Sequence, residues 1–197
     1  YEKVQIGELY FNMMQQDEPS AEIASNIFSY LNKEYPEEWI PYYYIGAIDI
    51  ITKKNNNYRE NFLKAIQFAD TSRDVYTNIG FSFFSQGDIA DALSILNEGL
   101  AKYPDDFRMN YIKALTLQRD NRESESVEYF EKALLANPNE IQVLSALGLI
   151  YDNQGKYEKS EEIYERALKI DPQNALVLNN YAYNLSERGV KLDKALA

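Results

Sequence analysis

Apolar residues recur along this chain at the spacing of amphipathic helices, without the alternation typical of strands. Within residues 141–151 the apolar positions share one face of a helix with 3.6 residues per turn: Val143, Leu144, Leu147, Ile150 and Tyr151. The stretch 153–156 then breaks the pattern with Gly155, a residue that commonly ends a helix. A second apolar face follows over 163–170 and stops before Pro172. The pattern over 141–174 therefore predicts two helices joined by a short turn.

The same pattern repeats along the chain with a period of 34 residues. Small residues recur at Gly46, Gly80, Ala114, Gly148 and Ala182, and again at Ala65, Gly99, Ala133 and Ala167. Bulky residues recur at Phe28, Phe62, Leu96, Phe130 and Tyr164, and prolines at Pro36, Pro104, Pro138 and Pro172, with Asp70 in the intervening place. The period predicts five complete helix pairs and part of a sixth: 5–38, 39–72, 73–106, 107–140, 141–174 and 175–197.

Helix packing gives a physical reason for this spacing. A small residue where two helices cross lets their backbones approach, and a large ring from the other helix fills the space. A proline ends each repeat because it cannot continue the preceding helix, although it tolerates the start of the next. A single helix pair cannot hide its apolar face, so neighbouring pairs must stack. We therefore expect an all-α stack of helix pairs.

The fifth repeat resembles the tetratricopeptide repeat most closely. Its matching residues are Leu147, Gly148, Tyr151, Gly155, Lys156, Tyr157, Ala167, Leu168, Asp171 and Pro172. A second good match consists of Gly80, Gly87, Ala92 and Pro104. The resemblance implies a right-handed solenoid of antiparallel helix pairs that covers residues 1–197 as one domain.

Several repeats depart from the family pattern, which leaves their local geometry open. The first keeps only its second-helix marks, Ala24, Phe28 and Pro36, and the second has 53–57 (Lys-Lys-Asn-Asn-Asn) in place of a glycine turn. The fourth has Lys113 where a large apolar residue is usual. The sixth has one extra residue between Gly189 and Ala195 and stops about one turn into its second helix, 192–197. The chain is therefore expected to be part of a longer protein.

Composition narrows the possible functions. The chain is 45% hydrophobic with a formal charge of −11, which disfavours binding to nucleic acid or to anionic lipid and favours neutral or basic partners. It has no Cys and no His, so it has no imidazole base, thiolate nucleophile or Cys/His metal site. We expect no enzyme activity, no cofactor and no metal. The lack of Cys suits a reducing cytosol and a periplasm alike, so the compartment stays open.

The family resemblance implies a concave groove lined by the first helix of each repeat. The positions that face such grooves correspond here to Tyr43, Ala47, Ile50, Thr77, Phe81, Phe84, Tyr111, Leu115, Gln118, Ser145, Leu149, Asp152, Asn179 and Tyr183. This surface would be aromatic and aliphatic with few charges, and apolar patches of this kind bind partners. Packing is an equal alternative for Tyr43 and Tyr111, and burial against the next repeat is favoured for Phe81 and Phe84.

One family function is disfavoured. Members that bind acidic peptide tails carry Lys, Asn and Arg at inner positions, whereas the residues here are Tyr43/Ala47, Thr77/Phe81 and Tyr111/Leu115. The leading prediction is therefore an adaptor that binds a partner peptide or helix by apolar contact. The alternatives are a self-associating or spacer domain of a larger assembly, and the substrate-recruiting part of an enzyme whose catalytic part lies outside residues 1–197.

Overall fold

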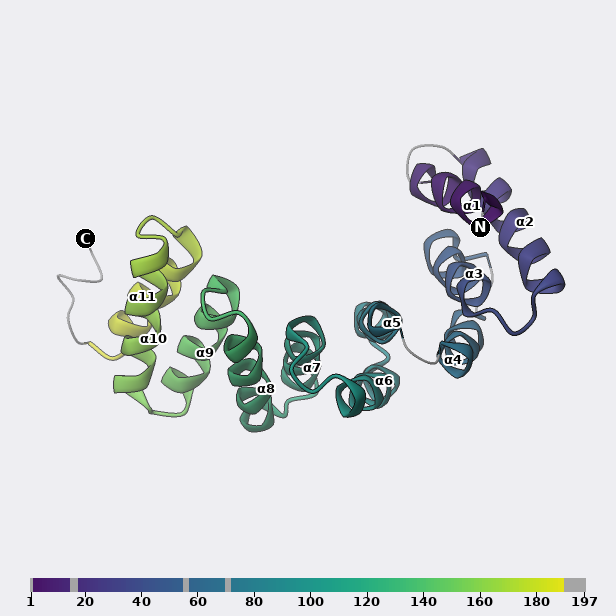
Figure 1. Cartoon of the computed structure of the whole chain (residues 1–197). Helices are drawn as coiled ribbons and strands as arrows, with labels where there is room; N and C mark the ends of the chain where they lie inside the picture. Colours follow the sequence, from purple (N-terminus) through teal and green to yellow (C-terminus); the bar gives the residue numbers. More distant parts are fainter. Residues whose placement is uncertain (1, 15–17, 55–56, 70–71, 190–197) are drawn as a thin grey trace. The chain divides into compact units, whose positions relative to one another are not determined.

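The protein is all-α over the residues that the computed structural model describes: 2–14, 18–54, 57–69 and 72–189. Figure 1 shows the helices in chain order. Within the described ranges they are α1 (Glu2–Met13), α2 (Glu18–Glu34), α3 (Trp39–Thr52), α4 (Tyr58–Phe68), α5 (Arg73–Gln86), α6 (Ile89–Lys102), α7 (Phe107–Arg119), α8 (Glu123–Ala136), α9 (Ile141–Asn153), α10 (Tyr157–Ile170) and α11 (Ala175–Glu187). The all-α prediction is confirmed.

The chain forms two compact units, unit 1 over residues 1–86 and unit 2 over residues 87–197. In unit 1, α1 packs on α2 and α3 packs on α4; in unit 2, α7 packs on α8 and α9 packs on α10. Neighbouring pairs are linked by contacts of α2 with α3 and of α8 with α9. The boundary between the units falls within the predicted third repeat, so one continuous solenoid stays a prediction. The predicted second helix of the sixth repeat lies outside the described residues, as does Asp70.

The predicted crossings of small and large residues are present in both units. A Cβ placed on Gly46 would lie 2.8 Å from the ring of Phe62, and one on Gly148 would lie 2.7 Å from the ring of Tyr164. Real Cβ atoms do not approach other carbons so closely, because the optimum separation is about 3.5–4.0 Å. Phe62 and Tyr164 are each 0% exposed. The helices of these pairs are therefore held at a distance that only glycine permits.

The first helix pair uses the same crossing in a different register. A Cβ on Gly7 would lie 2.7 Å from the ring of Phe28, so Gly7 is the crossing residue of α1. Gly7 and Phe28 are 21 residues apart, whereas Gly46 and Phe62 are 16 apart. The helix accordingly begins at Glu2, ahead of the predicted start of this repeat at residue 5. The added residues between glycine and ring shift the first helix relative to the 34-residue period.

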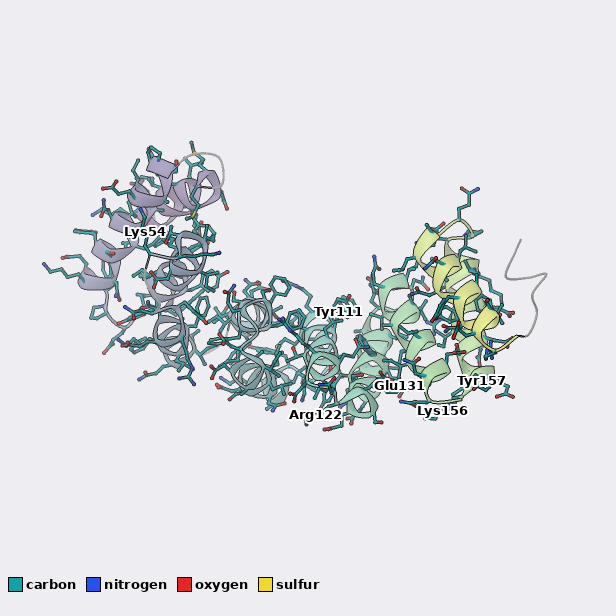
Figure 2. The ribbon with its side chains drawn as sticks, turned by 180° about the vertical axis from the view of Figure 1, so that it is seen from behind. Lys54, Tyr111, Arg122, Glu131, Lys156 and Tyr157 are labelled. Atoms are coloured by element: carbon teal, nitrogen blue, oxygen red, sulfur yellow. The ribbon has the colours of Figure 1, made fainter. Side chains whose placement is uncertain are left out.

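The turns inside the pairs use left-handed backbone conformations. Gly87, Gly155 and Gly189 have φ of +86°, +71° and +64°, which glycine adopts without strain. In the pairs that lack this glycine, Lys53 (φ 53°) and Asn121 (φ 59°) take the same role. Lys54, Arg122 and Lys156 mark three of these turns in Figure 2. The glycine-free turn that the sequence shows after α3 therefore still reverses the chain.

Lys113 is buried in unit 2 although the family pattern favours an apolar residue there. Its side chain is 8% exposed, and its ammonium donates a hydrogen bond to Asn97 Oδ1 on α6. The same Nζ lies 3.8 Å from the centre of the Tyr129 ring on α8, a cation–π distance. The lysine thus joins three helices, and its stem supplies the apolar contact expected at this position. Among the described helices none is both long and apolar enough to cross a membrane.

Candidate functional site

The candidate site is, within each unit, the surface made by the first helices of the pairs, here called the inner face of that unit. In unit 1 it is built from α1, α3 and α5, which follow one another because α3 contacts both α1 and α5. In unit 2 it comprises α7, α9 and α11, and α9 contacts α11. In unit 1, α1 and α3 pack on α2 and α4, and in unit 2, α7 and α9 pack on α8 and α10. The inner face is the side of these helices that remains for other contacts.

In unit 1 the predicted residues divide between packing and exposure. Tyr43 is half-buried, with its ring 5.1 Å from that of Tyr44 and 6.1 Å from that of Phe62, so its ring belongs partly to the core. Phe81 is 51% exposed and its ring lies 6.3 Å from the half-buried Phe84. The preference for burial of Phe81 was therefore wrong. Ala47 and Ile50 are half-buried on α3.

Thr77 does not reach the inner surface. It is 1% exposed, and its hydroxyl donates a hydrogen bond to the Arg73 carbonyl at 3.2 Å. Ser145 is likewise 2% exposed and accepts a hydrogen bond from Asn180 Nδ2 at 3.1 Å. The expectation that these two residues contact a partner is corrected, because short side chains at these positions are covered by their neighbours. Thr77 bonds within α5, whereas Ser145 joins α9 to α11.

The inner face of unit 2 keeps several large side chains accessible. Tyr111 on α7 is half-buried and stacks on Phe107 at 5.9 Å (Figure 2). Leu115 and Gln118 are half-buried on the same helix. On α9 and α11 the accessible residues are Leu149, 36% exposed, Tyr183, 60% exposed, and the exposed Asn179. The structure thus leaves most of the predicted unit 2 residues on the surface, and their role in binding stays a prediction.

Asp152 makes an ion pair within the protein. Its side chain is 12% exposed, and Oδ1 lies 3.5 Å from Nε of Arg188, which also reaches Glu161 Oε1 at 3.3 Å. Burial raises the pKa of Asp152, while the charge of Arg188 opposes that rise. Arg188 also lies over the ring of Tyr157, 4.7 Å from its centre. The expected role of Asp152 in the groove is therefore corrected to a contact that joins α9, α10 and the end of α11.

Two inner-face residues escaped the sequence analysis. Glu8 on α1 accepts a hydrogen bond from the hydroxyl of Tyr44 on α3 at 3.0 Å. Burial, and then this hydrogen bond, raise the pKa of Tyr44 well above its ordinary value. Glu8 was missed because the 34-residue register does not apply to α1. Gly7 is the signal that could have revealed Glu8. A glycine marks the position where two helices cross, and Glu8 is the next residue along the same helix.

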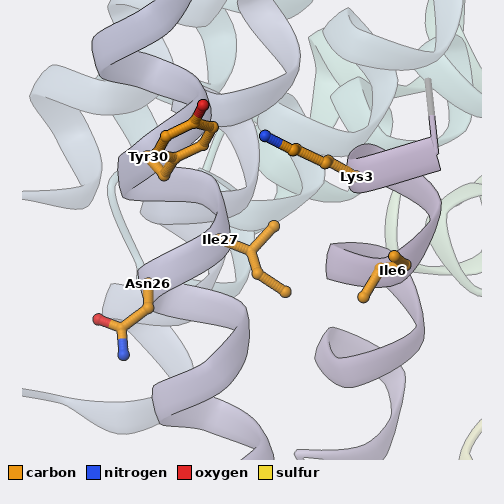
Figure 3. A pocket seen from close by; sticks show the side chains of 5 residues that line it. All are labelled: Lys3, Ile6, Asn26, Ile27 and Tyr30. Atoms are coloured by element: carbon orange, nitrogen blue, oxygen red, sulfur yellow. The ribbon is translucent and has the colours of Figure 1, made fainter.

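Two hollows of the surface lie away from the inner positions predicted above. One, of about 350 Å³, lies between α1 and α2 and is lined by Lys3, Ile6, Asn26, Ile27 and Tyr30 (Figure 3). Within it, Lys3 Nζ lies 4.1 Å from the centre of the Tyr30 ring. Another, of about 450 Å³, is bordered by Tyr157 and four glutamates of α10. Both are open and shallow depressions of single helix pairs, so neither replaces the inner face as the candidate site.

Comparison with known proteins identifies the repeat. A family model described as the N-terminal tetratricopeptide-repeat region of Psidin matches residues 76–184. Photosystem I assembly protein Ycf3 from two strains of Prochlorococcus marinus is 28% identical over 120 residues and 29% over 103 residues. These alignments cover 52% and 50% of this chain, and 69% and 60% of the two Ycf3 proteins.

Solved structures share the fold at low identity. PilF of Pseudomonas aeruginosa has a TM-score of 0.73 at 18% identity, with 100% of this chain and 90% of that chain covered. MamA has a TM-score of 0.71 at 18% identity, with 84% of this chain and 96% of that chain covered. YrrB, described as a tetratricopeptide-repeat protein with an unusual peptide-binding site, gives 0.67 at 17%, with coverage of 85% and 86%. Since the family match spans more than half of the sequence, the chain belongs to the tetratricopeptide-repeat family.

Proposed function

We propose that the protein is a non-catalytic scaffold that binds an apolar segment of a partner protein on its inner face. The observation that carries this proposal is the exposure of large apolar side chains there: Phe81 at 51%, Leu149 at 36% and Tyr183 at 60%. Leu144 and Leu147 of the same α9 helix are 0% and 1% exposed. The exposure of Leu149 is therefore a property of one side of a well-packed helix.

The chemistry of this face suits an apolar partner segment. The accessible residues of α9 and α11 at these positions are aliphatic, aromatic or amide side chains, and Asp152 is held by Arg188. Burying apolar surface contributes roughly 25 cal/mol per Å², and aromatic residues supply much of the affinity of protein interfaces. The likeness to Ycf3, an assembly protein, and to YrrB, described as peptide-binding, supports a scaffold role of this kind.

Site-specific photo-crosslinking tests the proposal. A photoreactive phenylalanine analogue is placed at Leu149 or at Tyr183, and as a control at Leu135 on α8, which is 84% exposed outside the inner face. The proteins are irradiated in extract from the native cells, and the products are identified by mass spectrometry. We expect the same partner to crosslink from both inner positions and not from the control.

The competing functions give different products. Crosslinks between two copies of the chain would favour the self-associating or spacer function. Crosslinks to an enzyme subunit would favour the substrate-recruiting function. A partner captured only from Leu135 would refute binding on the inner face. As a second measurement, Leu149→Glu should weaken the interaction with the captured partner at least tenfold, while Leu135→Glu leaves it unchanged.

A further inference from the structure

Glu8 is an acidic residue set among aromatic rings on the inner face of unit 1. It lies on α1 with Val4 and Phe11, at helical spacing of four and three residues, so the three share one side of the helix. That side meets α3, because Glu8 bonds to Tyr44 and the ring of Phe11 lies 5.0 Å from that of Tyr44. The carboxylate therefore sits where α1 and α3 meet.

The aromatic residues around it form a connected group. Tyr44 stacks on Phe28 at 4.4 Å with nearly parallel rings, and Tyr43 packs edge-on to Tyr44 at 5.1 Å. Phe11, Tyr43 and Tyr44 are each half-buried, so part of the surface of each residue is open to solvent. The faces of such rings carry negative potential and attract cations within about 6 Å.

Glu8 has no basic partner among the described residues. The polar contact that the structure shows for its carboxylate is the bond from the neutral hydroxyl of Tyr44, and Glu8 itself is partly buried. The nearest basic residue on the same helix, Lys3, lies instead over the ring of Tyr30 on α2. A partly buried carboxylate loses hydration, and a single neutral hydrogen bond compensates only part of that loss. A cation from outside would compensate the rest.

We propose that this part of the inner face recognises a lysine or arginine of the bound segment, with the cation beside Glu8 and its carbon stem against Phe11, Tyr43 and Tyr44. The inference rests on the proposed function and adds a charge preference to it. It accords with the formal charge of −11, which draws basic segments toward the protein. A carboxylate pairs with lysine or arginine through charge-assisted hydrogen bonds, which are stronger than neutral ones. The flanking residues of the segment would be apolar, to match the rings.

The test is selection of peptides from a random 12-residue display library by the whole chain. Wild type is compared with Glu8→Gln, which keeps an oxygen to accept the Tyr44 hydrogen bond but removes the charge, and with Glu8→Lys. Glu22→Gln, which removes a charge from an exposed site of α2, is the matched control. Circular dichroism of each variant verifies that the helices are retained.

We expect wild type and Glu22→Gln to enrich peptides with a fixed Lys or Arg next to apolar residues. A selected peptide should bind about tenfold more tightly than its norleucine version, and this ratio should fall to about one with Glu8→Gln. Glu8→Lys should instead enrich acidic peptides. Raising salt should reduce the wild-type ratio only modestly, since partly buried charge pairs are screened less than exposed ones.

Two different failures can be told apart. Selected peptides without a basic residue, or a tenfold ratio that survives Glu8→Gln, would overturn the charge preference and leave apolar binding intact. A selection that enriches no peptide with any of the proteins would overturn both the preference and peptide binding on the inner face.

Discussion

Adding one methyl group at Gly148 should destabilise unit 2. The Cβ of Gly148→Ala would lie 2.7 Å from Cε1 and Cζ of Tyr164, about 1 Å inside the optimum separation of carbon atoms. The ring cannot move aside easily, because Tyr164 is 0% exposed and its hydroxyl accepts a hydrogen bond from Asn184 Nδ2 at 3.2 Å. Overpacking of this kind costs about 1–3 kcal/mol. The higher helix propensity of alanine offsets about 1 kcal/mol of this cost.

The expected net loss is therefore about 1 kcal/mol, and up to about 2 kcal/mol if the ring does not yield. Urea unfolding followed by circular dichroism would show it as a midpoint lowered by about 0.5–1 M, for a slope of about 2 kcal/mol per M. The propensity contribution is calibrated by comparing Glu162→Gly with Glu162→Ala, at an exposed site inside α10. Hydrogen exchange of the α9 amides would show whether the loss is confined to this pair.

A double-mutant cycle tests the cause. Tyr164→Leu removes the ring from the crossing, so in that background Gly148→Ala should be neutral or slightly stabilising. An equal loss in both backgrounds would mean that the methyl group acts on something other than the Tyr164 ring. A stabilised single variant would refute the close approach of α9 and α10 altogether.

The remaining predictions concern polar groups of unit 2. Lys113→Met should change the free energy of unfolding by less than about 1.5 kcal/mol, since it keeps the volume of the side chain. Asn97→Ala should cost about 1–3 kcal/mol, because it leaves a buried ammonium without its acceptor. Chemical denaturation checks both values, and a strongly destabilised Lys113→Met would contradict the view that the lysine stem supplies the packing. Burial and the hydrogen bond to Glu131 raise the pKa of the Tyr151 hydroxyl. Above about pH 10 the folded protein therefore keeps this proton, whereas the unfolded chain loses it. The free energy of unfolding should accordingly fall as the pH rises past about 10. In urea titrations between pH 9 and 11, Tyr151→Phe should make the loss of stability with pH shallower. An unchanged dependence of stability on pH would contradict the role of the Tyr151 hydroxyl.

The sequence was most informative where a small residue and a ring recur together. Gly148 with Tyr164 and Gly46 with Phe62 lie at the predicted crossings, because steric fit at a crossing restricts residue type strongly. Gly7 escaped because the period assumes a fixed distance between glycine and ring, whereas Phe28 lies further along its own helix than Phe62 does. A period can be read only where the ring keeps its place along the second helix.

The candidate site was harder to predict, because a position on a helix does not state how much its neighbours cover it. Thr77 and Phe81 belong to the same expected surface, yet one is 1% and the other 51% exposed. Side-chain length and the contacts of the next helix decide this difference. Glu8 could not be recognised from its own helix, because the residue that contacts it, Tyr44, lies 36 positions away in the sequence.

The crossing of Gly7 with Phe28 bears on how such chains evolve and can be engineered. The segment between these residues is longer than in the other pairs, yet the same close approach is kept. The added length lies in α2, which begins ten residues before Phe28, whereas α4 begins four residues before Phe62. A single methyl group is sterically excluded at both crossings. Inheritance should thus tolerate a second helix that is extended at its N-terminal end, provided that the glycine and the ring still meet. A duplicated or transplanted repeat should keep its crossing when it is moved as a whole pair.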